Sequence, residues 1–213
     1  LHLPLTDQPA VTGRPSLAPE GKLPPLGALA LPIRRGQIAS GDVEAELDAQ
    51  HDRFVAALGR EPDFIDGHQH VHFLPVSRAW LRKRFAGNAD KPALRGAPAR
   101  AGSLATALKV AAVAALAAGF DRSMRQAGFP VMRPLTGLYD WRHPDRFAPT
   151  LLAAVETLPE EGLFMCHPGH IDETLRSRDA MLAAREAEFA FLASDDFGVH
   201  LSRAGAEVMR FAG

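Results

Sequence analysis

The sequence predicts an α/β protein with a parallel sheet, and two observations support this fold class. Apolar runs that suit strands alternate along the chain with segments of helical periodicity. Histidine-rich clusters directly follow two of these apolar runs, and the functional loops of parallel sheets lie at that position. The length of 213 residues allows one sizeable domain or two small ones, and is ample for a single hydrophobic core. We therefore expect residues 1–213 to form one domain with its site at the carboxyl ends of the strands.

Charge and cysteine content exclude several functional classes. The chain has 24 basic and 25 acidic residues, so no global field favours nucleic acid or an anionic membrane. Its one cysteine, Cys166, cannot form an intramolecular disulfide, which is consistent with a cytoplasmic protein. The apolar stretch 104–120 contains Lys109 and falls short of the roughly 20 apolar residues of a membrane span. We expect it to be a buried or half-buried helix, with an interfacial helix or subunit contact as the alternative.

The spacing of apolar residues and the positions of proline, glycine and capping residues predict the other elements. The first forty residues are rich in proline and glycine, which predicts a long irregular segment. Such a segment is either a lid or substrate-binding edge, or a solvated connection. Asp42 is expected to cap the next helix and Gly59 to end it. We expect helices over 42–58, 77–85, 104–118, 147–158 and 178–194, strands over 63–66, 129–139, 163–167 and 207–211, and a loop over 87–102.

The run from Asp66 to His72 is the first candidate site. In an extended chain, His68, His70 and His72 would point to one face together with Asp66. Neutral imidazole is the commonest protein ligand for a divalent ion, and a nearby carboxylate fixes its tautomer. A surface strand with coincidental histidines is the alternative, and we favour the metal site.

A second cluster follows the apolar run 163–165. Cys166 is expected to be a buried, inert residue at a strand end. His167 precedes a Pro-Gly turn and could act as a general acid, as a further ligand or as a structural residue. Near the start of the chain, His2 lies in an alternating apolar and polar run that suits a strand end.

Three other polar residues are expected at the surface. His51 lies within the predicted helix 42–58, where a surface role is favoured over catalysis. Asp195 and Asp196 are expected in a solvated turn that ends the helix 178–194.

These motifs together resemble the YdjC-like family, whose characterised type is the chitooligosaccharide deacetylase. The segment 1–6 is similar to the family's Gly-x-His-x-x-Leu-Thr run without its glycine. The segment 64–72 resembles the Asp-x-His-x-His-x-His segment, and 165–169 with Asp172 resembles the Cys-His-Pro turn. The proline-rich start, the alanine-rich stretch and the short length resemble the branch associated with hopanoid biosynthesis.

The resemblance implies a variant (β/α) barrel. It also implies hydrolysis of an N-acetyl group, from an amino sugar or a glycolipid-linked sugar, by a metal-activated water. The family's metal is bound by an N-terminal Asp and two histidines, which correspond here to His2 and His68. Magnesium is the usual ion, although two imidazoles also suit zinc, manganese or cobalt.

The same resemblance gives roles to the other candidate residues. His167 and Asp66 are expected to be catalytic, with His167 protonating the leaving amine. His70, His72 and Asp172 are expected to bind the substrate or to support the site. The expected partner is a small carbohydrate, without nucleic acid or a membrane span, and a homodimer is a candidate assembly.

One departure from the family pattern stands out. The family opens with an Ala-Asp-Asp-Phe-Gly strand ahead of the His2 motif, and this sequence lacks it. The stretch 195–198 repeats some of its letters at the wrong end of the chain and receives no role. We therefore expect an N-terminally truncated domain without the first barrel strand and helix. The alternative is a catalytically incomplete metal- or sugar-binding remnant.

Overall fold

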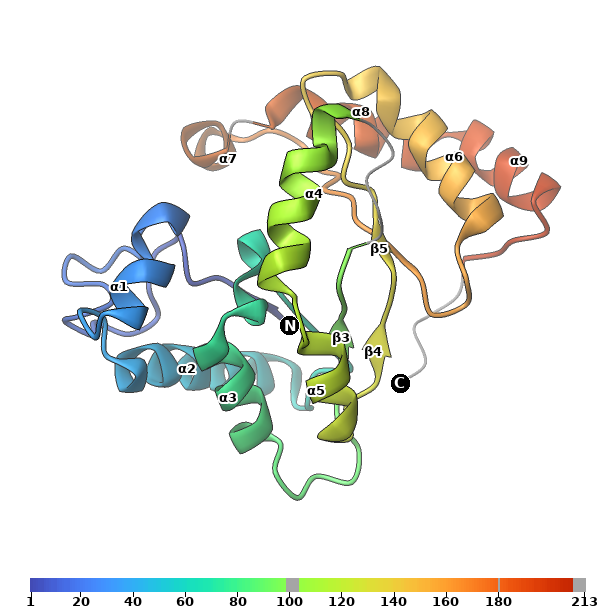
Figure 1. Cartoon of the computed structure of the whole chain (residues 1–213). Coiled ribbons are helices and arrows are strands. Elements are labelled where there is room, and N and C mark those ends of the chain that lie inside the picture. Colours follow the sequence, from blue (N-terminus) through green and yellow to red (C-terminus); the bar gives the residue numbers. More distant parts are fainter. Residues whose placement is uncertain (99–103, 180, 209–213) are drawn as a thin grey trace. The chain divides into compact units, whose positions relative to one another are not determined.

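The computed structural model describes residues 1–98, 104–179 and 181–208 and confirms an α/β fold with parallel sheets (Figure 1). In the four-stranded sheet β1 pairs with β2 and β2 with β3, both in parallel, and β5 pairs with β6 in the same way in a second sheet. The order of the larger sheet is β1-β2-β3-β4. The strands are β1 (His2–Leu3), β2 (Phe64–Gly67), β3 (Ala93–Arg95), β4 (Val131–Met132), β5 (Leu135–Thr136) and β6 (Leu163–Phe164).

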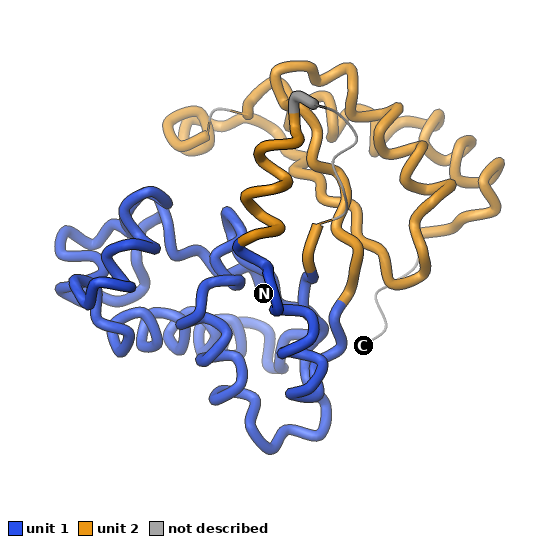
Figure 2. The backbone as a smooth tube through the Cα atoms, in the orientation of Figure 1, with its two compact units in different colours: residues 1–96, 116–131, 212–213 blue, residues 97–115, 132–211 orange. Residues whose placement is uncertain are grey.

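The chain divides into two compact units whose stretches alternate along the sequence (Figure 2). Among the described residues, the first unit comprises 1–96 and 116–131. The second comprises 97–98, 104–115, 132–179 and 181–208. The single domain expected over 1–213 stays a prediction.

The first unit is organised around the apolar residues of its strands. Leu3, Ile65 and Leu94 come from three neighbouring strands and are each 0% exposed. Full burial of such a side chain contributes about 1.5–3 kcal/mol, so these short strands are held together mainly by their apolar positions.

Helix α2 (Ser40–Leu58) confirms the helix expected over 42–58. It ends where the sequence places its stop, because Gly59 adopts a left-handed φ of 67° that glycine tolerates without strain. Asp42 is not its cap. The cap position is Ala39, and Asp42 instead accepts hydrogen bonds from the backbone and hydroxyl of Ser16.

The first forty residues are largely irregular, as expected, but contain a short 3-10 helix η1 (Leu26–Ala28) and helix α1 (Ala30–Arg34). They are tied to α2 by Glu46, which is 0% exposed. Its carboxylate accepts hydrogen bonds from the backbone nitrogens of Val11 and Thr12, both 2.8 Å long. The irregular segment is therefore anchored to the helix by a buried charge.

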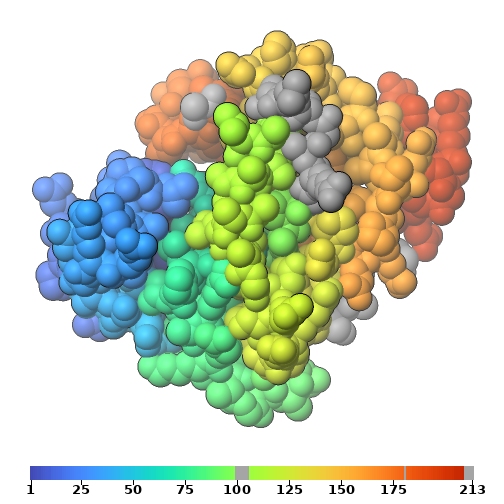
Figure 3. Space-filling model, in the orientation of Figure 1, coloured from blue at the N-terminus to red at the C-terminus, as the bar shows by residue number. Residues whose placement is uncertain are grey.

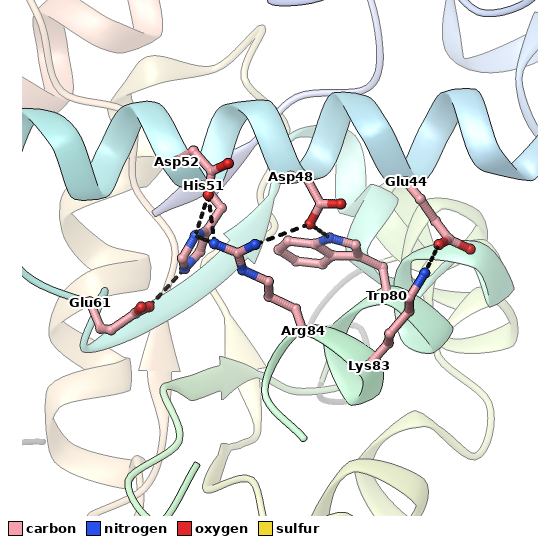
Figure 4. A network of polar contacts seen from close by, with 8 residues as sticks. All are labelled: Glu44, Asp48, His51, Asp52, Glu61, Trp80, Lys83 and Arg84. Atoms are coloured by element: carbon pink, nitrogen blue, oxygen red, sulfur yellow. Dashed lines mark hydrogen bonds and ion pairs between the residues drawn. The ribbon is translucent and has the colours of Figure 1, made fainter. Parts of the chain in front are cut away.

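Helix α3 (Pro75–Arg84) packs against α2, and a polar network joins the two helices (Figure 4). His51 on α2 lies within this network and is 0% exposed, so the expected surface position is wrong. Its Nε2 lies 2.7 Å from Glu61, and its Nδ1 accepts from Arg84 at 2.9 Å. The sequence did not reveal this position because α3 covers the face of α2 that carries His51.

Two further elements, a strand and a helix, also fall where none was predicted. Strand β3 lies inside the expected loop 87–102, and helix α5 (Phe120–Gln126) follows the alanine-rich helix. That helix, α4 (Leu104–Leu116), is half-buried as expected: Val110 and Val113 are buried, and Leu108 is 86% exposed. Its side chains form the yellow-green column of Figure 3.

The second unit buries Tyr139, Phe147 and Leu151 against partly buried apolar residues of its helices, of β6 and of the turn at Trp141. Helix α6 (Phe147–Thr157) confirms the prediction over 147–158. The other elements are the 3-10 helix η3 (Pro144–Arg146) and the helices α7 (Glu173–Arg178), α8 (Leu182–Leu192) and α9 (Asp195–Arg203).

The helix expected over 178–194 is present but shorter: α8 forms over Leu182–Leu192, because the chain is extended at Asp179, the C-cap of α7. The prediction for the next residues is wrong. Asp195 and Asp196 do not end a helix but form the first turn of α9, whose cap is Ser194. Acidic side chains in a first turn are favoured by the helix dipole. Residues 207 and 208 form no strand, and 209–211 lie outside the described residues.

In the part of the chain that the structure describes, no helix combines the length and the apolar character needed to cross a membrane.

Candidate active site

The histidine cluster forms a tight turn rather than an extended strand. Strand β2 ends at Gly67, and the 3-10 segment η2 (His68–Phe73) follows it. Gln69 and His70 have left-handed φ angles of 47° and 65° inside this turn. The prediction that three alternating histidines share one strand face is therefore wrong, because the backbone reverses before His70.

Gly67 allows the turn to fold back closely on the strand. A Cβ atom at this position would lie 2.7 Å from the backbone nitrogen of His72 and 2.9 Å from its Nδ1. His72 is 1% exposed, and its Nε2 donates to the carbonyl of Arg95 at 3.1 Å. Burial holds the pKa of His72 well below its usual value, so this imidazole is neutral in the interior.

Parallel pairing brings the amino-terminal histidine to the same turn. In the β1–β2 register His2 lies opposite Asp66, and His2 Nδ1 is 2.6 Å from Asp66 Oδ1. The rings of His2 and His68 meet edge to face with centroids 5.8 Å apart. The side chain of His2 is 54% exposed, so this pair of imidazoles is open to solvent on the His2 side.

The electrostatics of Asp66 favour its ionised form. Burial by itself raises the pKa of this carboxyl group, but the hydrogen bond and charge of His2 and the charge of Arg95 outweigh it. The net effect is a lowered pKa. The Nε atom of Arg95 lies 3.3 Å from Asp66 Oδ2.

Arg95 is a central residue of this site that the sequence did not reveal. It ends β3, within the segment expected to be a loop, and its side chain is only 5% exposed. Its Nη1 donates to His70 Nδ1 at 2.9 Å, and its Nη2 donates to the carbonyl of Gly67. The pair Ala93-Leu94 before Arg95 has the same form as Phe64-Ile65 before Asp66, an apolar run ending in a charge. That likeness is the signal that could have identified it.

The turn is also joined to the irregular amino-terminal segment. Gln69 accepts a hydrogen bond from Thr6 and donates one to Asp7, each 3.0 Å long. Among the described residues, Asp7, Gln69 and His70 are the non-glycine residues with positive φ. Such strained positions cluster at functional sites in proteins. Beside them lies a hollow of about 410 Å³, lined by Asp7, Leu17, Glu20, Lys22, Leu23 and three prolines.

The second unit holds His167. Its backbone N–H donates to the carboxylate of Glu188, which is 0% exposed, and its carbonyl accepts from Arg185 at 3.1 Å. The His167 ring meets the Trp141 ring edge to face at 5.7 Å. Cys166 is exposed, so the expected burial is wrong: β6 ends at Phe164 and the cysteine lies in the loop beyond it.

Asp172 is the N-cap of α7. Its side chain accepts from the backbone nitrogen of Leu175 at 2.6 Å, a bond that satisfies one of the donors left open at a helix start. The structure thus brings His2, Asp66, His68 and His70 together in the first unit, while His167 and Asp172 lie in the second.

The donor set around His2 fits a metal ion in part. The Nδ1 contact with Asp66 leaves Nε2 of His2 as the atom that could ligate an ion, which is the usual arrangement of a carboxylate-oriented histidine ligand. His68 adds a second imidazole beside it. Within the described ranges, however, no group of three or more His, Cys, Asp or Glu side chains is placed to hold an ion. Two nitrogens are fewer than the three protein ligands of typical catalytic zinc sites.

The site lies where the parallel strands β1, β2 and β3 end, and in α/β enzymes small molecules bind at this edge. The fold and the site thus have the arrangement in which α/β proteins commonly bind small molecules. The family model of the YdjC-like proteins matches residues 1–203, and the chain belongs to this family.

The curated relatives are proteins named as carbohydrate or chitooligosaccharide deacetylases. A carbohydrate deacetylase of Mus musculus is 46% identical over 61 residues, which are 28% of this chain and 19% of the mouse protein. A chitooligosaccharide deacetylase of Yersinia pestis (strain Pestoides F) is 27% identical over 169 residues. That match covers 75% of this chain and 55% of the Yersinia protein, so the chain spans about half the length of this relative.

A solved structure shows the same fold. A protein of Enterococcus faecalis V583, named for cellobiose-phosphate cleavage, superposes with a TM-score of 0.61 at 22% identity. The match covers 98% of this chain and 74% of that one.

Proposed function

We propose that this chain carries out metal-dependent hydrolysis of an N-acetyl group on an amino sugar, free or linked to a glycolipid. The observation that carries the proposal is the contact between His2 and Asp66 beside His68, in a chain of the YdjC-like family. The names of the deacetylase relatives support the reaction and the carbohydrate class of substrate.

We propose His2, through Nε2, and His68 as ligands of a divalent ion, with further ligands needed to complete the set. Magnesium is the ion that the family resemblance suggests, while two imidazoles equally suit zinc, manganese or cobalt. When bound, such an ion polarises a carbonyl and makes water a better nucleophile.

The chain's own side chains orient the His2 ring and supply the proton for the leaving amine. Asp66 keeps the His2 ring in one orientation through the 2.6 Å contact. In the reaction the C–N bond of the amide breaks, the carbonyl carbon gains the OH group of a water molecule, and the amine gains a proton, which balances the second hydrogen of that water. We assign that proton to His167, whose backbone is fixed by Glu188 and Arg185. The hollow beside Asp7 is a candidate place for a sugar ring.

Finer parts of the proposal rest on the resemblance. The parallel pairing of β1 with β2 and of β5 with β6, with helices between the strands, is compatible with a variant (β/α) barrel. The hopanoid-associated branch, a cytoplasmic location and a homodimer are further proposals at this level, as are substrate contacts by His70, His72 and Asp172.

The full chain, freed of metal by a chelator, tests the proposal. It is incubated with N,N′-diacetylchitobiose and with added Mg²⁺, Zn²⁺, Mn²⁺ or Co²⁺, and acetate release is measured. We expect release only with a metal ion, loss of release in His68→Ala, and unchanged release in His143→Ala, which alters an exposed histidine. Unchanged release in His68→Ala would contradict the ligand assignment.

A non-catalytic binding remnant is the second candidate, and the two-imidazole donor set favours it. Calorimetric titration of the same chain with the same ions separates the two. Ion binding that depends on His68, together with no acetate release from the sugar, supports the remnant.

A further inference from the structure

The Arg95 side chain contacts two parts of the histidine turn at once. It lies beneath the turn with 5% of its surface exposed, its Nη1 is 2.9 Å from His70 Nδ1, and its Nε is 3.3 Å from Asp66. Asp66 in turn contacts His2 Nδ1 at 2.6 Å. The chain of contacts therefore runs from His70 through Arg95 and Asp66 to His2.

The contact with Arg95 determines which nitrogen of His70 carries the proton. A guanidinium group has only N–H donors and does not lose a proton in proteins. His70 Nδ1 must therefore accept through its lone pair, and the neutral ring carries its proton on Nε2. The orientation of the His70 ring is also restrained, because it stacks on the Phe73 ring with the two centroids 6.2 Å apart and 8° between the ring planes.

The contact with Asp66 determines the opposite arrangement in His2. An ionised carboxylate has only acceptor atoms, so His2 Nδ1 must donate to it. The neutral His2 ring then carries its lone pair on Nε2. The same ring atom, Nε2, therefore carries a lone pair in His2 and a hydrogen in His70.

We propose that Arg95 is a positioning residue that fixes His70 in the Nε2–H form while Asp66, aligned by the same guanidinium, fixes His2 in the Nδ1–H form. His2 then offers a lone pair to a cation or a proton. His70 offers a hydrogen bond to an oxygen atom, such as a sugar hydroxyl or an acetyl carbonyl. The role in substrate binding rests on the proposed function, whereas the two tautomers do not.

Nitrogen NMR measures the tautomers directly. Long-range ¹H–¹⁵N spectra of the ¹⁵N-labelled full chain at neutral pH distinguish Nδ1–H from Nε2–H rings, and His2→Gln and His70→Gln identify the two signals. We expect the Nε2–H pattern for His70 and the Nδ1–H pattern for His2. A His70 ring with its proton on Nδ1 would overturn the proposal, and this result is read in the unaltered chain.

Arg95→Lys tests the cause. It keeps the charge but loses the fork of donors, so we expect His70 to shift towards a mixture of tautomers. Arg84→Lys is the matched control, because Arg84 donates to His51 Nδ1 in the same way at 2.9 Å (Figure 4). This control should alter the His51 signal and leave His70 unchanged. An unaltered His70 pattern in folded Arg95→Lys would overturn the assigned cause.

Acetate release adds a separate readout. If the unaltered chain releases acetate, Arg95→Lys should lower kcat/KM by about 10–100-fold, the range seen when residues that orient ligands are changed, and Arg84→Lys should not. If the expected tautomers are found and no acetate is released, the inference on Arg95 stands and the proposed function fails.

Discussion

The hydroxyl of Tyr139 donates a 2.6 Å hydrogen bond to Glu188, a carboxylate that is completely buried in the second unit. The other carboxylate oxygen accepts from the backbone of His167. Burial raises the pKa of Tyr139, and the hydrogen bond to Glu188 adds to this effect, so the phenol stays a donor at all ordinary pH values. Glu188 thus links the segment after β5 to the loop that carries the proposed acid.

We predict that Tyr139→Phe destabilises the protein by about 1–3 kcal/mol, because a buried charge loses one of its donors. Urea unfolding followed by circular dichroism measures this change. Thr157→Ala is the control, since it removes an exposed hydrogen bond to Ala153 and should stay within about 0.5 kcal/mol. Equal effects of the two changes would contradict the importance of the buried carboxylate.

Glu46 predicts a pH dependence of stability. Burial by itself raises the pKa of this carboxyl group, but the hydrogen bonds from Thr12, Gln50 and the backbone of Val11 outweigh it, and the pKa is lowered from its ordinary 4.5. A lowered pKa in the folded state means that the contribution of Glu46 is fully present above about pH 4.5. It is lost as the pH falls through the folded-state value.

We therefore predict that Glu46→Gln lowers the free energy of unfolding at pH 7 by about 1.5–3 kcal/mol. The difference from the unaltered chain should shrink as the pH falls below 4.5, because both chains then lack the charge. Urea titrations at several pH values measure the difference. Glu160→Gln changes an exposed carboxylate and should show no such trend. A pH-independent difference for Glu46→Gln would refute the linkage.

Gly67 gives a third prediction. A methyl group there meets His72 backbone and ring atoms below 3.0 Å, so Gly67→Ala must displace the histidine turn. We expect destabilisation of about 1–3 kcal/mol, the usual cost of overpacking. Gly198→Ala in α9 is a matched control, because a Cβ there meets nothing within 4 Å. Alanine is the better helix former, so this control should be stabilising by roughly 0.5–1 kcal/mol.

Asp66→Asn removes the negative charge of the carboxylate but keeps the size and shape of the side chain. The amide oxygen can still accept from His2 Nδ1, but the charge opposite Arg95 is lost. We predict a loss of about 10–100-fold in metal affinity or in kcat/KM. Calorimetry with the activating ion and acetate release measure the two quantities. Asp145→Asn, at an exposed position, should change neither, and an unaffected Asp66→Asn would show that the carboxylate does not serve the site.

Local pattern was enough to predict the fold class and much of the element order. Helices α2 and α6 form where the spacing of apolar residues predicts them. Gly59 ends α2 because the backbone there has a left-handed φ, which glycine adopts without strain. Strand β3 could not be predicted in this way, because three residues between prolines and glycines form a strand only when β2 supplies hydrogen-bond partners.

The candidate site also combines features that the sequence predicts with features that depend on long-range contacts. The family resemblance implied that His2 and the 66–72 run would serve one site, and their register places His2 opposite Asp66. The turn itself depends on long-range contacts: Gln69 is held by Thr6 and Asp7, and His70 by Arg95. His51 was assigned to the surface for the same reason, because its burial depends on a helix that comes later in the chain.

The two units are interleaved along the chain, and this affects how the protein can be dissected. Residues 97–98 and 104–115 belong to the second unit but interrupt the first, which resumes at 116. No single cut releases either unit as one continuous peptide. A fragment ending at Gly96 keeps β1, β2 and β3 but omits α5, whose Phe120 packs on Phe73 with ring centroids 4.8 Å apart. Half-chain expression would therefore leave a core aromatic without its neighbour, whereas a gene in which a linker joins residue 96 directly to residue 116 could supply the first unit in one piece.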